Sequence, residues 1–102
     1  MIARYWKGIV KADMTEAYME HLQEDTLNVV SEMKGFFGAS VLKKEVSNGV
    51  EFVVITEWDS IETIAQFSGK DLEKAVVPDL AKSMMVTYDD RVIHYEVAHK
   101  RG

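Results

Sequence analysis

Asn48 and Gly49 lie between two runs of residues that favour an extended backbone, residues 36–46 and 50–58. An Asn-Gly pair in that position is a strong signal for a tight β-hairpin, because both residues tolerate the positive φ angles that such a turn requires. The two runs are therefore predicted to pair as antiparallel neighbours in a sheet. The rest of the chain has to be arranged around this hairpin.

A long amphipathic helix is predicted before the hairpin. Asp13 or Thr15 offers an N-terminal cap, and Gly35 stands where a left-handed C-terminal cap is expected. Between them, apolar side chains recur at spacings of three and four, which places them on one face of the helix. This apolar face comprises Met14, Ala17, Tyr18, His21, Leu22, Val29, Val30 and Met33.

A second helix is predicted after the hairpin. Asp59 caps it, and Glu62 three residues later completes a capping box. Its buried side comprises Ile61, Ile64, Ala65 and Phe67. Gly69 ends this helix, a further helical piece is predicted over residues 71–77, and a turn over residues 78–82 follows.

Strands at both ends of the chain complete the pattern. Residues 2–11 and 88–97 are rich in β-branched and aromatic side chains, which favour extended structure. The resulting order β-α-β-β-α-β is that of a ferredoxin-like α+β domain with an antiparallel sheet. At 102 residues the chain fits one such domain, over residues 1–102.

Both faces of the predicted sheet carry bulky apolar side chains. Alternate positions of the strand over residues 50–58 belong to opposite faces. One face carries Phe52, Val54, Thr56 and Trp58, and the other carries Val53 and Ile55. Helices cover only one face of a ferredoxin-like sheet, so the second apolar face would meet water in a monomer. We therefore expect two copies to pack face to face as a homodimer.

The composition excludes several classes of function. The chain has no cysteine, which rules out disulfides, thiolate nucleophiles and cysteine-based zinc or iron–sulfur sites. A net charge of −5 argues against nucleic acid as a partner, because phosphate binding requires a basic face. No apolar stretch reaches the roughly 18 residues that span a bilayer, and the N-terminus lacks the layout of a signal peptide. We expect a cytoplasmic protein without a membrane or nucleic-acid partner.

No motif by itself identifies a reaction. The sequence contains no glycine-rich phosphate loop, no HExxH and no GxSxG. None of its three histidines stands at metal-ligand spacing from another, so no metal site is expected. His21 lies on the apolar side of the first helix and is interpreted as a core contact, and His99 is interpreted as a solvated residue of the tail.

His94 is the candidate catalytic residue. It lies within the last predicted strand and shares a face with Glu96, whose carboxylate could tune the imidazole near neutral pH. The alternative is a hydrogen-bonded histidine at an interface. The sequence leaves both interpretations open.

Two tryptophans and one arginine are candidate ligand contacts. Trp6 and Trp58 either pack in the core or line a flat apolar pocket between sheet and helices, which would suit an aromatic ligand. Arg4 shares a face with Trp6, and a charge within an apolar strand must reach water, a carboxylate or an anionic ligand. We expect a salt bridge, for which Glu96 is the candidate partner.

The chain as a whole resembles the antibiotic biosynthesis monooxygenase family. The resemblance lies in residues 2–8, in the junction TEWDS at residues 56–60 with the helix at 64–67, and in residues 94–97. It implies a small dimeric α/β barrel. Some members of the family oxygenate polycyclic phenols or quinols without metal or flavin, others degrade haem, and many have no assigned reaction.

The positions that haem-degrading members use are changed in this chain. The resemblance places their first-strand asparagine near Trp6, their helix tryptophan at Phe67 and their histidine iron ligand at Val77. Valine cannot bind iron, so haem degradation by that route is not expected and no cofactor is predicted. For the cofactor-free members the resemblance implies a pocket of aromatic and a few polar side chains, with Phe67 as a candidate contributor beside Arg4, Trp6 and Trp58.

Three hypotheses for the function follow. The first is a monooxygenase-like homodimer that binds a small aromatic or quinol-type ligand and oxygenates it without a cofactor. The second is a non-catalytic ligand-binding or stress-related protein of the same fold, and the third is a haem-binding protein that uses His21 or His94. The sequence leaves open whether the protein is an enzyme. A cavity that contains Trp6 or Trp58 together with His94 is the structural test of the first hypothesis.

Overall fold

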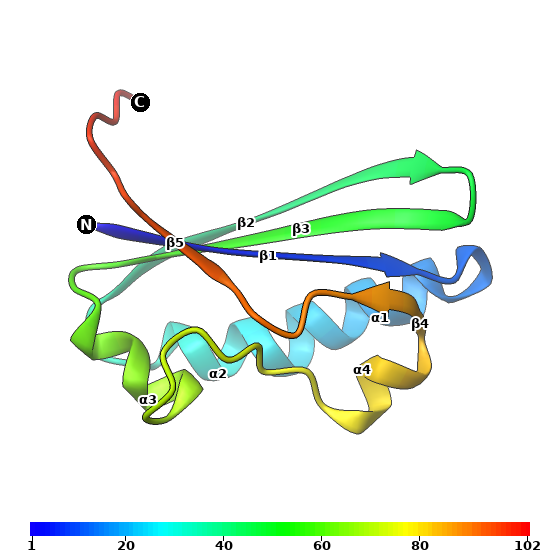
Figure 1. Cartoon of the computed structure of the whole chain (residues 1–102), viewed down its shortest axis with the longest axis horizontal. Coiled ribbons are helices and arrows are strands. Elements are labelled where there is room, and N and C mark those ends of the chain that lie inside the picture. Colours follow the sequence, from blue (N-terminus) through cyan, green and yellow to red (C-terminus); the bar gives the residue numbers. More distant parts are fainter.

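The computed structural model describes residues 1–102 and consists of a sheet with all helices on one face (Figure 1). The strands are β1 (Ile2–Val10), β2 (Phe36–Val46), β3 (Gly49–Trp58), β4 (Met85–Tyr88) and β5 (Ile93–Glu96). They form one open antiparallel sheet in the order β2-β3-β1-β4, and β5 pairs with the first half of β1. The predicted α+β ferredoxin-like fold is confirmed.

The hairpin between β2 and β3 forms as predicted, but its turn is not the predicted Asn48-Gly49 pair, because Gly49 already belongs to β3 and Asn48 has no positive φ. The two strands pair up to Val46 opposite Gly49, so Ser47 and Asn48 make the connection. On its other side β3 pairs with β1 along the full length of β1, with Trp6 opposite Val54. The hairpin and β1 together form the centre of the sheet.

The first helix is a continuous rod with an irregular middle. It consists of α1 (Thr15–His21), a π-helical segment over Leu22–Thr26 and α2 (Leu27–Ser31), after a 3-10 turn at Ala12–Met14. Gly35 has a φ of 85°, but the helix ends before it, at the C-cap Glu32, so Gly35 lies in the turn that leads into β2 and is not the predicted cap. The predicted N-terminal cap is wrong, because the Thr15 hydroxyl donates to the Ala12 carbonyl (2.9 Å) and no side chain caps the helix.

The π-helical segment changes which residues face the sheet. In a regular α-helix, side chains four residues apart are displaced steadily in one direction around the helix axis. The wider π turn offsets this displacement, so a row of such side chains stays on one face. A row of residues with a spacing of four faces the sheet: Tyr18, Leu22, Thr26 and Val30. Ala17 and Val29, which the regular spacing placed on the buried face, are exposed instead.

The second helix is shorter than predicted. It consists of a 3-10 turn at Glu62–Ile64 and α3 (Ala65–Ser68), and Gly69 ends it with a φ of 79°. The predicted capping box is wrong, because Asp59 Oδ1 accepts a hydrogen bond from the Thr63 hydroxyl (3.0 Å) and not from a helix N–H group. Ala65, predicted on the buried side, is exposed.

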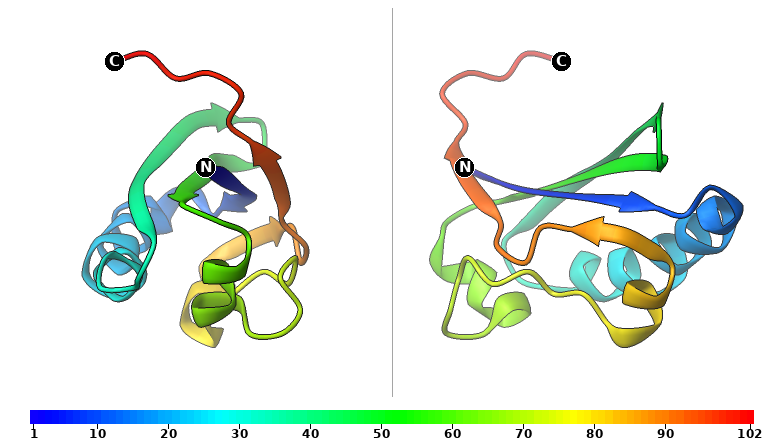
Figure 2. Two further views of the ribbon diagram at one scale, coloured as in Figure 1. Left: turned by 90° about the vertical axis from the view of Figure 1, so that its left-hand side faces the viewer. Right: turned by 45° about the vertical axis from the view of Figure 1, so that its right-hand side comes forward.

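Residues 69–78, here called the strap, connect α3 to α4 (Asp79–Ser83) without a helix. The predicted helical piece over residues 71–77 is therefore wrong. The strap is bound to the end of the sheet by backbone hydrogen bonds, from Ala75 N–H to the Asp90 carbonyl (3.0 Å) and from Val92 N–H to the Glu73 carbonyl (2.7 Å). Figure 2 shows that the strap and the helices lie under the same face of the sheet.

The strand predicted over residues 88–97 forms only as β5 (Ile93–Glu96), and β4 (Met85–Tyr88) lies almost entirely before it. The break between them, residues 89–92, contains the Asp89 carbonyl, which accepts a hydrogen bond from the Trp6 indole N–H (2.8 Å). It also contains Val92, which turns into the core. Residues 89–92 thus contact Trp6 and the core, and the predicted continuous strand over residues 88–97 is wrong.

The two faces of the sheet differ in what covers them. On the helix face, Trp6, Phe52 and Trp58 belong to two buried core clusters. The opposite face carries partly exposed side chains that alternate with them, as predicted from the strand pattern. Its apolar members include Tyr5, Ile9, Val53, Ile55, Leu42, Ile93 and Tyr95.

None of the helices has the length and hydrophobicity that a membrane-spanning helix requires.

Candidate functional site

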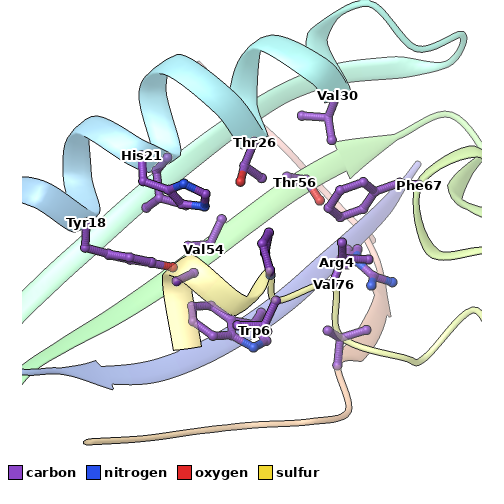
Figure 3. Close-up of a pocket in the computed structure, with 15 residues that line it drawn as sticks. Arg4, Trp6, Tyr18, His21, Thr26, Val30, Val54, Thr56, Phe67 and Val76 are labelled. Atoms are coloured by element: carbon purple, nitrogen blue, oxygen red, sulfur yellow. The ribbon is translucent and has the colours of Figure 1, made fainter. Parts of the chain in front are cut away.

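A cavity lies between the helix face of the sheet and the helices (Figure 3). It measures about 50 Å³, or about 550 Å³ of space between atoms when its open mouth is included. Ten of its fifteen lining residues are hydrophobic. β1 and β3 form its floor, the row of side chains on the first helix forms one wall, and α3, the strap and α4 form the other. An apolar cavity with a few polar groups is the usual form of a small-molecule site.

Aromatic side chains form a large part of the cavity wall. The Tyr18 ring lies tilted against Trp6 (6.5 Å between centroids) and edge-on against Phe52 (5.0 Å). The Trp6 indole is fixed by its hydrogen bond to the Asp89 carbonyl. Phe67 contributes from α3 on the opposite side. Packing and hydrogen bonding therefore hold the flat surface of Trp6 toward the cavity.

Arg4 is buried in the floor of the cavity, with 3% of its surface exposed. Its guanidinium donates to the carbonyls of Leu72 (2.6 Å) and Lys74 (2.7 Å) in the strap, and it lies 5.6 Å from the centre of the Phe67 ring. Burial lowers the pKa of Arg4 to about 10, because desolvation disfavours the charged form.

The expected salt bridge from Arg4 to Glu96 is wrong. No carboxylate lies within 4.0 Å of the guanidinium, whose partners are two carbonyls and His94. Arginine has five N–H donors. Three of them are used within the protein, so a buried cation beside an apolar cavity retains unpaired donors and an uncompensated charge.

His94 lies behind Arg4 and does not line the cavity. Its Nε2 is 3.1 Å from Arg4 Nη1, and because arginine can only donate, this nitrogen accepts the hydrogen bond. Burial and the charge of Arg4 lower the pKa of His94 below its ordinary value of 6.5, against an opposing effect of Glu73. His94 is therefore a neutral imidazole bound to the arginine.

Trp58 also lies outside the cavity. It is fully buried in the second core cluster with Val30 and Ile64, and Phe36 packs edge-on against its ring at 5.5 Å. Its indole N–H donates to the Thr56 hydroxyl (2.9 Å). The structure thus brings together three of the residues singled out from the sequence, Arg4, Trp6 and Phe67, and leaves His94 and Trp58 outside.

Three polar groups on the first helix line the cavity: Tyr18, His21 and Thr26. Of these, only His21 was considered for a site, as a possible haem ligand. The Tyr18 hydroxyl, the His21 Nε2 and the Thr26 hydroxyl have no hydrogen-bond partner in the protein, yet no fully buried polar side-chain atom lacks one. Their polar atoms must therefore reach the cavity or solvent. The predicted apolar face already contained Tyr18 and His21, which were interpreted as core contacts. The signal for Thr26 was the spacing of four from Tyr18 to Val30, which a regular helix does not keep on one face.

The three positions that the resemblance assigned to haem-degrading members all line this cavity. Trp6 lies in its floor, Phe67 in its wall and Val77 in the strap. The register inferred from sequence therefore points to the same cavity as the geometry. No cluster of three or more histidine, aspartate or glutamate side chains that could hold a metal ion is present.

Comparison with known proteins places the chain in a family. The sequence profile described as antibiotic biosynthesis monooxygenase matches residues 1–78. A search of curated proteins finds no match to the sequence.

Solved structures show the same fold. A protein from Bacillus cereus, provisionally named an antibiotic biosynthesis monooxygenase, has a TM-score of 0.69 at 20% identity, over 100% of this chain and 95% of its own. A conserved protein from Methanosarcina mazei Go1 has a TM-score of 0.68 at 19% identity, over 92% and 89% of the two chains. The haem degrader MhuD from Mycobacterium tuberculosis, solved with two haems in its active site, has a TM-score of 0.62 at 19% identity over 100% of both chains.

Proposed function

The chain belongs to the antibiotic biosynthesis monooxygenase family, and on that basis we propose that its cavity binds a small phenol- or quinol-type ligand, which the protein oxygenates without a cofactor. The observation that carries the proposal is Arg4, a buried cation in the floor of an apolar cavity with no carboxylate partner. A buried charge is costly unless it is compensated. The anionic oxygen of an ionised phenol or quinol would supply that compensation, while its ring would pack against Trp6 and Phe67.

An ionised phenol or quinol also suits the chemistry. Its electron-rich ring can react with O₂ directly, and one oxygen atom enters the ring while the other leaves as water. The substrate itself supplies the electrons that O₂ takes up, so no external reductant is required. What the protein must provide is a dry, shaped site, stabilisation of the anion and a group that accepts its proton.

The size of the cavity requires that a ligand displaces part of its wall. A cavity of about 150 Å³ holds benzene, whereas this cavity measures about 50 Å³ without its mouth. A second hollow of about 490 Å³ lies on the other side of the strap. Phe67, Val76, Val77 and Pro78 line both spaces and so form the partition between them. Movement of this partition would give a single-ring ligand both access and room.

Haem, which occupies the active site of the structurally similar MhuD, does not fit these residues. The strap presents Val77, which cannot bind iron, at the position that the resemblance assigns to the iron ligand, and a porphyrin is far larger than the single-ring ligand that movement of the partition would admit. His21 is the one imidazole that lines the cavity, and it stands on the first helix opposite the strap. We derive no step through haem, and a haemin titration without a Soret shift would agree with this.

The assembly and location of the protein are part of the proposal. The uncovered sheet face, with Tyr5, Ile55 and Tyr95 partly exposed, supports a homodimer that buries this face between two copies. Burying each large apolar side chain stabilises the dimer by roughly 1.5–3 kcal/mol. A chain without cysteine suits a reducing compartment, and we propose the cytoplasm.

Two measurements test the proposed function. Binding of hydroquinones and phenols is followed by quenching of tryptophan fluorescence, with Trp6→Phe to identify the reporting residue. Oxygen uptake with the same compounds measures turnover in protein freed of metals by a chelator. Saturable binding with oxygen uptake above the rate in buffer is the expected result. Binding without oxygen uptake would favour the non-catalytic ligand-binding alternative, and the absence of both would contradict the proposal.

A further inference from the structure

We propose that His21 accepts the proton of the ligand hydroxyl, that Asp25 stabilises the resulting imidazolium, and that Tyr18 donates a hydrogen bond to the ligand. This inference rests on the proposed function, since it assigns the proton transfer that precedes the reaction with O₂. The ligand O–H bond breaks and an N–H bond forms at His21 Nε2. A neutral ligand and a neutral imidazole thereby become an anion and a cation.

The position of the imidazole is the first observation that supports this role. His21 lines the cavity, and its side chain is only 7% exposed. Its ring stacks on Tyr18 with 6.2 Å between centroids and 29° between planes, which fixes its orientation. Figure 3 shows the ring directed from the helix into the cavity. If His21 only filled the core, both of its ring nitrogens should have hydrogen-bond partners, because buried polar atoms are usually hydrogen-bonded.

The two ring nitrogens have different surroundings. Nδ1 faces Asp25 on the next turn of the helix, with 3.8 Å to Oδ2. Nε2 has no protein partner and, because no fully buried polar side-chain atom is unsatisfied, it reaches the cavity or solvent; His21 lines the cavity, and its ring is directed into it in Figure 3. A proton on Nδ1 is favoured by the nearby carboxylate, which leaves Nε2 as the acceptor. In this arrangement the His21 imidazole is the base and the Asp25 carboxylate orients it. The distance between Nδ1 and Oδ2 can shorten when the imidazole becomes charged.

The π-helical segment brings the polar groups of the first helix onto the face that lines the cavity. It begins directly after His21, contains Asp25 and ends at Thr26. Single π turns inside α-helices occur frequently at functional sites. Here the wider turn rotates the Thr26 hydroxyl onto the same face as Tyr18, so that polar groups of three consecutive turns reach the cavity.

The other groups around the cavity cannot accept a proton near neutral pH. Burial raises the pKa of the Tyr18 hydroxyl, so this group remains a donor. Arg4, on the facing strand β1, remains charged because its pKa is still about 10. The strap and α4 contribute only Val76, Val77, Pro78 and Ala81 to the lining, and none of these titrates. Imidazole is the side chain that ordinarily exchanges a proton between about pH 5 and 8.

The charges after the transfer are complementary to the site. The phenolate lies in a cavity whose floor contains the uncompensated Arg4 cation, and the imidazolium lies beside Asp25. Each new charge therefore has an opposite charge near it. Without His21 the ligand would have to lose its proton to water before it entered an apolar site.

The test uses 4-nitrophenol, whose absorption band distinguishes the neutral from the ionised form. Binding is measured by tryptophan fluorescence and ionisation by absorbance, over a pH series, for the wild type, His21→Gln and the matched control His99→Gln in the exposed tail. We expect the bound probe to ionise at lower pH in the wild type and in His99→Gln than in His21→Gln, by about one pH unit or more. Asp25→Asn is expected to give an intermediate shift.

The outcomes separate this inference from the proposed function. If 4-nitrophenol and the hydroquinones do not bind the wild type, the proposed function fails. If His21→Gln binds the probe and ionises it at the same pH as the wild type, the assignment of His21 is overturned while the proposed function stands. A second measurement uses the wild type alone. Ligand binding must shift the His21 ring protons in the NMR spectrum to imidazolium values, and unchanged neutral values would also overturn the assignment.

Discussion

Arg4 on β1 and His94 on β5 lie directly opposite each other, and the arginine donates a hydrogen bond of 3.1 Å to the histidine Nε2. The same guanidinium holds the carbonyls of Leu72 and Lys74. One side chain therefore joins two strands to the strap that partitions the cavity from the second hollow. His94 must be neutral to accept this hydrogen bond, so its protonation state is coupled to the attachment of the strap to the sheet.

Arg4→Met is expected to loosen the strap. The substitution keeps the apolar stem but leaves two partly buried carbonyls and His94 without a donor. Hydrogen bonds to a charged group contribute about 1.5–3 kcal/mol each and do not add fully, so the free energy of unfolding should fall by about 2–4 kcal/mol. Urea denaturation measures this loss, and limited trypsin digestion should show faster cleavage after Lys70 or Lys74.

Arg91→Met is the matched control for that substitution. Arg91 also binds the strap, through Asp71 (2.6 Å) and Glu73 (3.3 Å), but from an exposed position on the outer side. Exposed ion pairs contribute little to stability. The change in unfolding free energy should be clearly smaller than for Arg4→Met, and equal losses for the two variants would show that burial of Arg4 is unimportant.

His94 should make the stability of the protein depend on pH. Its pKa is lowered below 6.5 in the folded state, so the unfolded chain binds the proton more tightly. Stability is therefore complete above about pH 6.5 and is lost as the pH falls through the lower folded-state pKa. His94→Gln retains an acceptor for Arg4 without titrating. We expect the melting temperature of the wild type to fall more steeply than that of His94→Gln as the pH is lowered from about 7.5 to about 5.

All other titratable groups are common to these two proteins, so the difference between the two melting curves isolates His94. A difference that grows as the pH falls agrees with the structure. Parallel curves would mean that His94 is not desolvated beside Arg4.

Predictions that depended on the backbone freedom of glycine and on strand geometry were better than those of helix caps, which were wrong at both helices. Gly69 ends α3 with a positive φ, and Gly35 has a positive φ in the turn before β2. Both follow from the conformational freedom of glycine in any chain. The hairpin also forms, although its turn is Ser47-Asn48 and not the predicted Asn-Gly pair. The alternation of buried and half-buried residues in β3 was predictable because it follows from the geometry of a strand.

Predictions that depended on distant partners were not obtainable from the sequence. Residues 71–77 have a helical pattern, but Arg4, far away in the chain, takes the carbonyls of Leu72 and Lys74. The same contact made the expected pairing of Arg4 with Glu96 wrong. For the site, Arg4, Trp6 and Phe67 were identified. Helical periodicity placed Tyr18 and His21 on the correct face, but they were interpreted as core contacts, and Thr26 was missed because periodicity cannot reveal a π turn.

The two tryptophans should respond differently to removal of the indole N–H. Trp58→Phe breaks the buried hydrogen bond to Thr56 and leaves a void in a closed cluster, so stability should fall by about 2–3 kcal/mol. Its affinity for 4-nitrophenol should be unchanged, because Trp58 does not line the cavity. Trp6→Phe should weaken binding several-fold, equivalent to about 1 kcal/mol of aromatic contact. Absorbance titration and urea denaturation of both variants check these expectations.

A loss of affinity in Trp58→Phe as large as that in Trp6→Phe would contradict the placement of the cavity. The stability of each variant has to be measured first, since partial unfolding would weaken binding without any contact to the ligand. At a temperature well below both unfolding transitions this effect is removed.

The uncovered face of the sheet provides the last prediction. Ile55 lies near the middle of this face, opposite Tyr5 on β1 and Ser40 on β2. If two copies bury this face, Ile55→Asp places two carboxylates in an apolar interface without partners, which is strongly unfavourable. We expect sedimentation to show a dimer for the wild type and a monomer for Ile55→Asp. The folded monomer should lose only about 1 kcal/mol from the lower strand propensity of aspartate.

Gln23→Asp adds the same charge on the exposed outer side of the first helix and should remain dimeric. This control separates the effect of net charge from the effect of its position, which matters because the chain already carries a charge of −5. A wild type that sediments as a monomer at micromolar concentration would contradict the proposed assembly. A dimer that survives Ile55→Asp would show that the copies meet through another surface, because two unpaired carboxylates buried at one interface would strongly destabilise it.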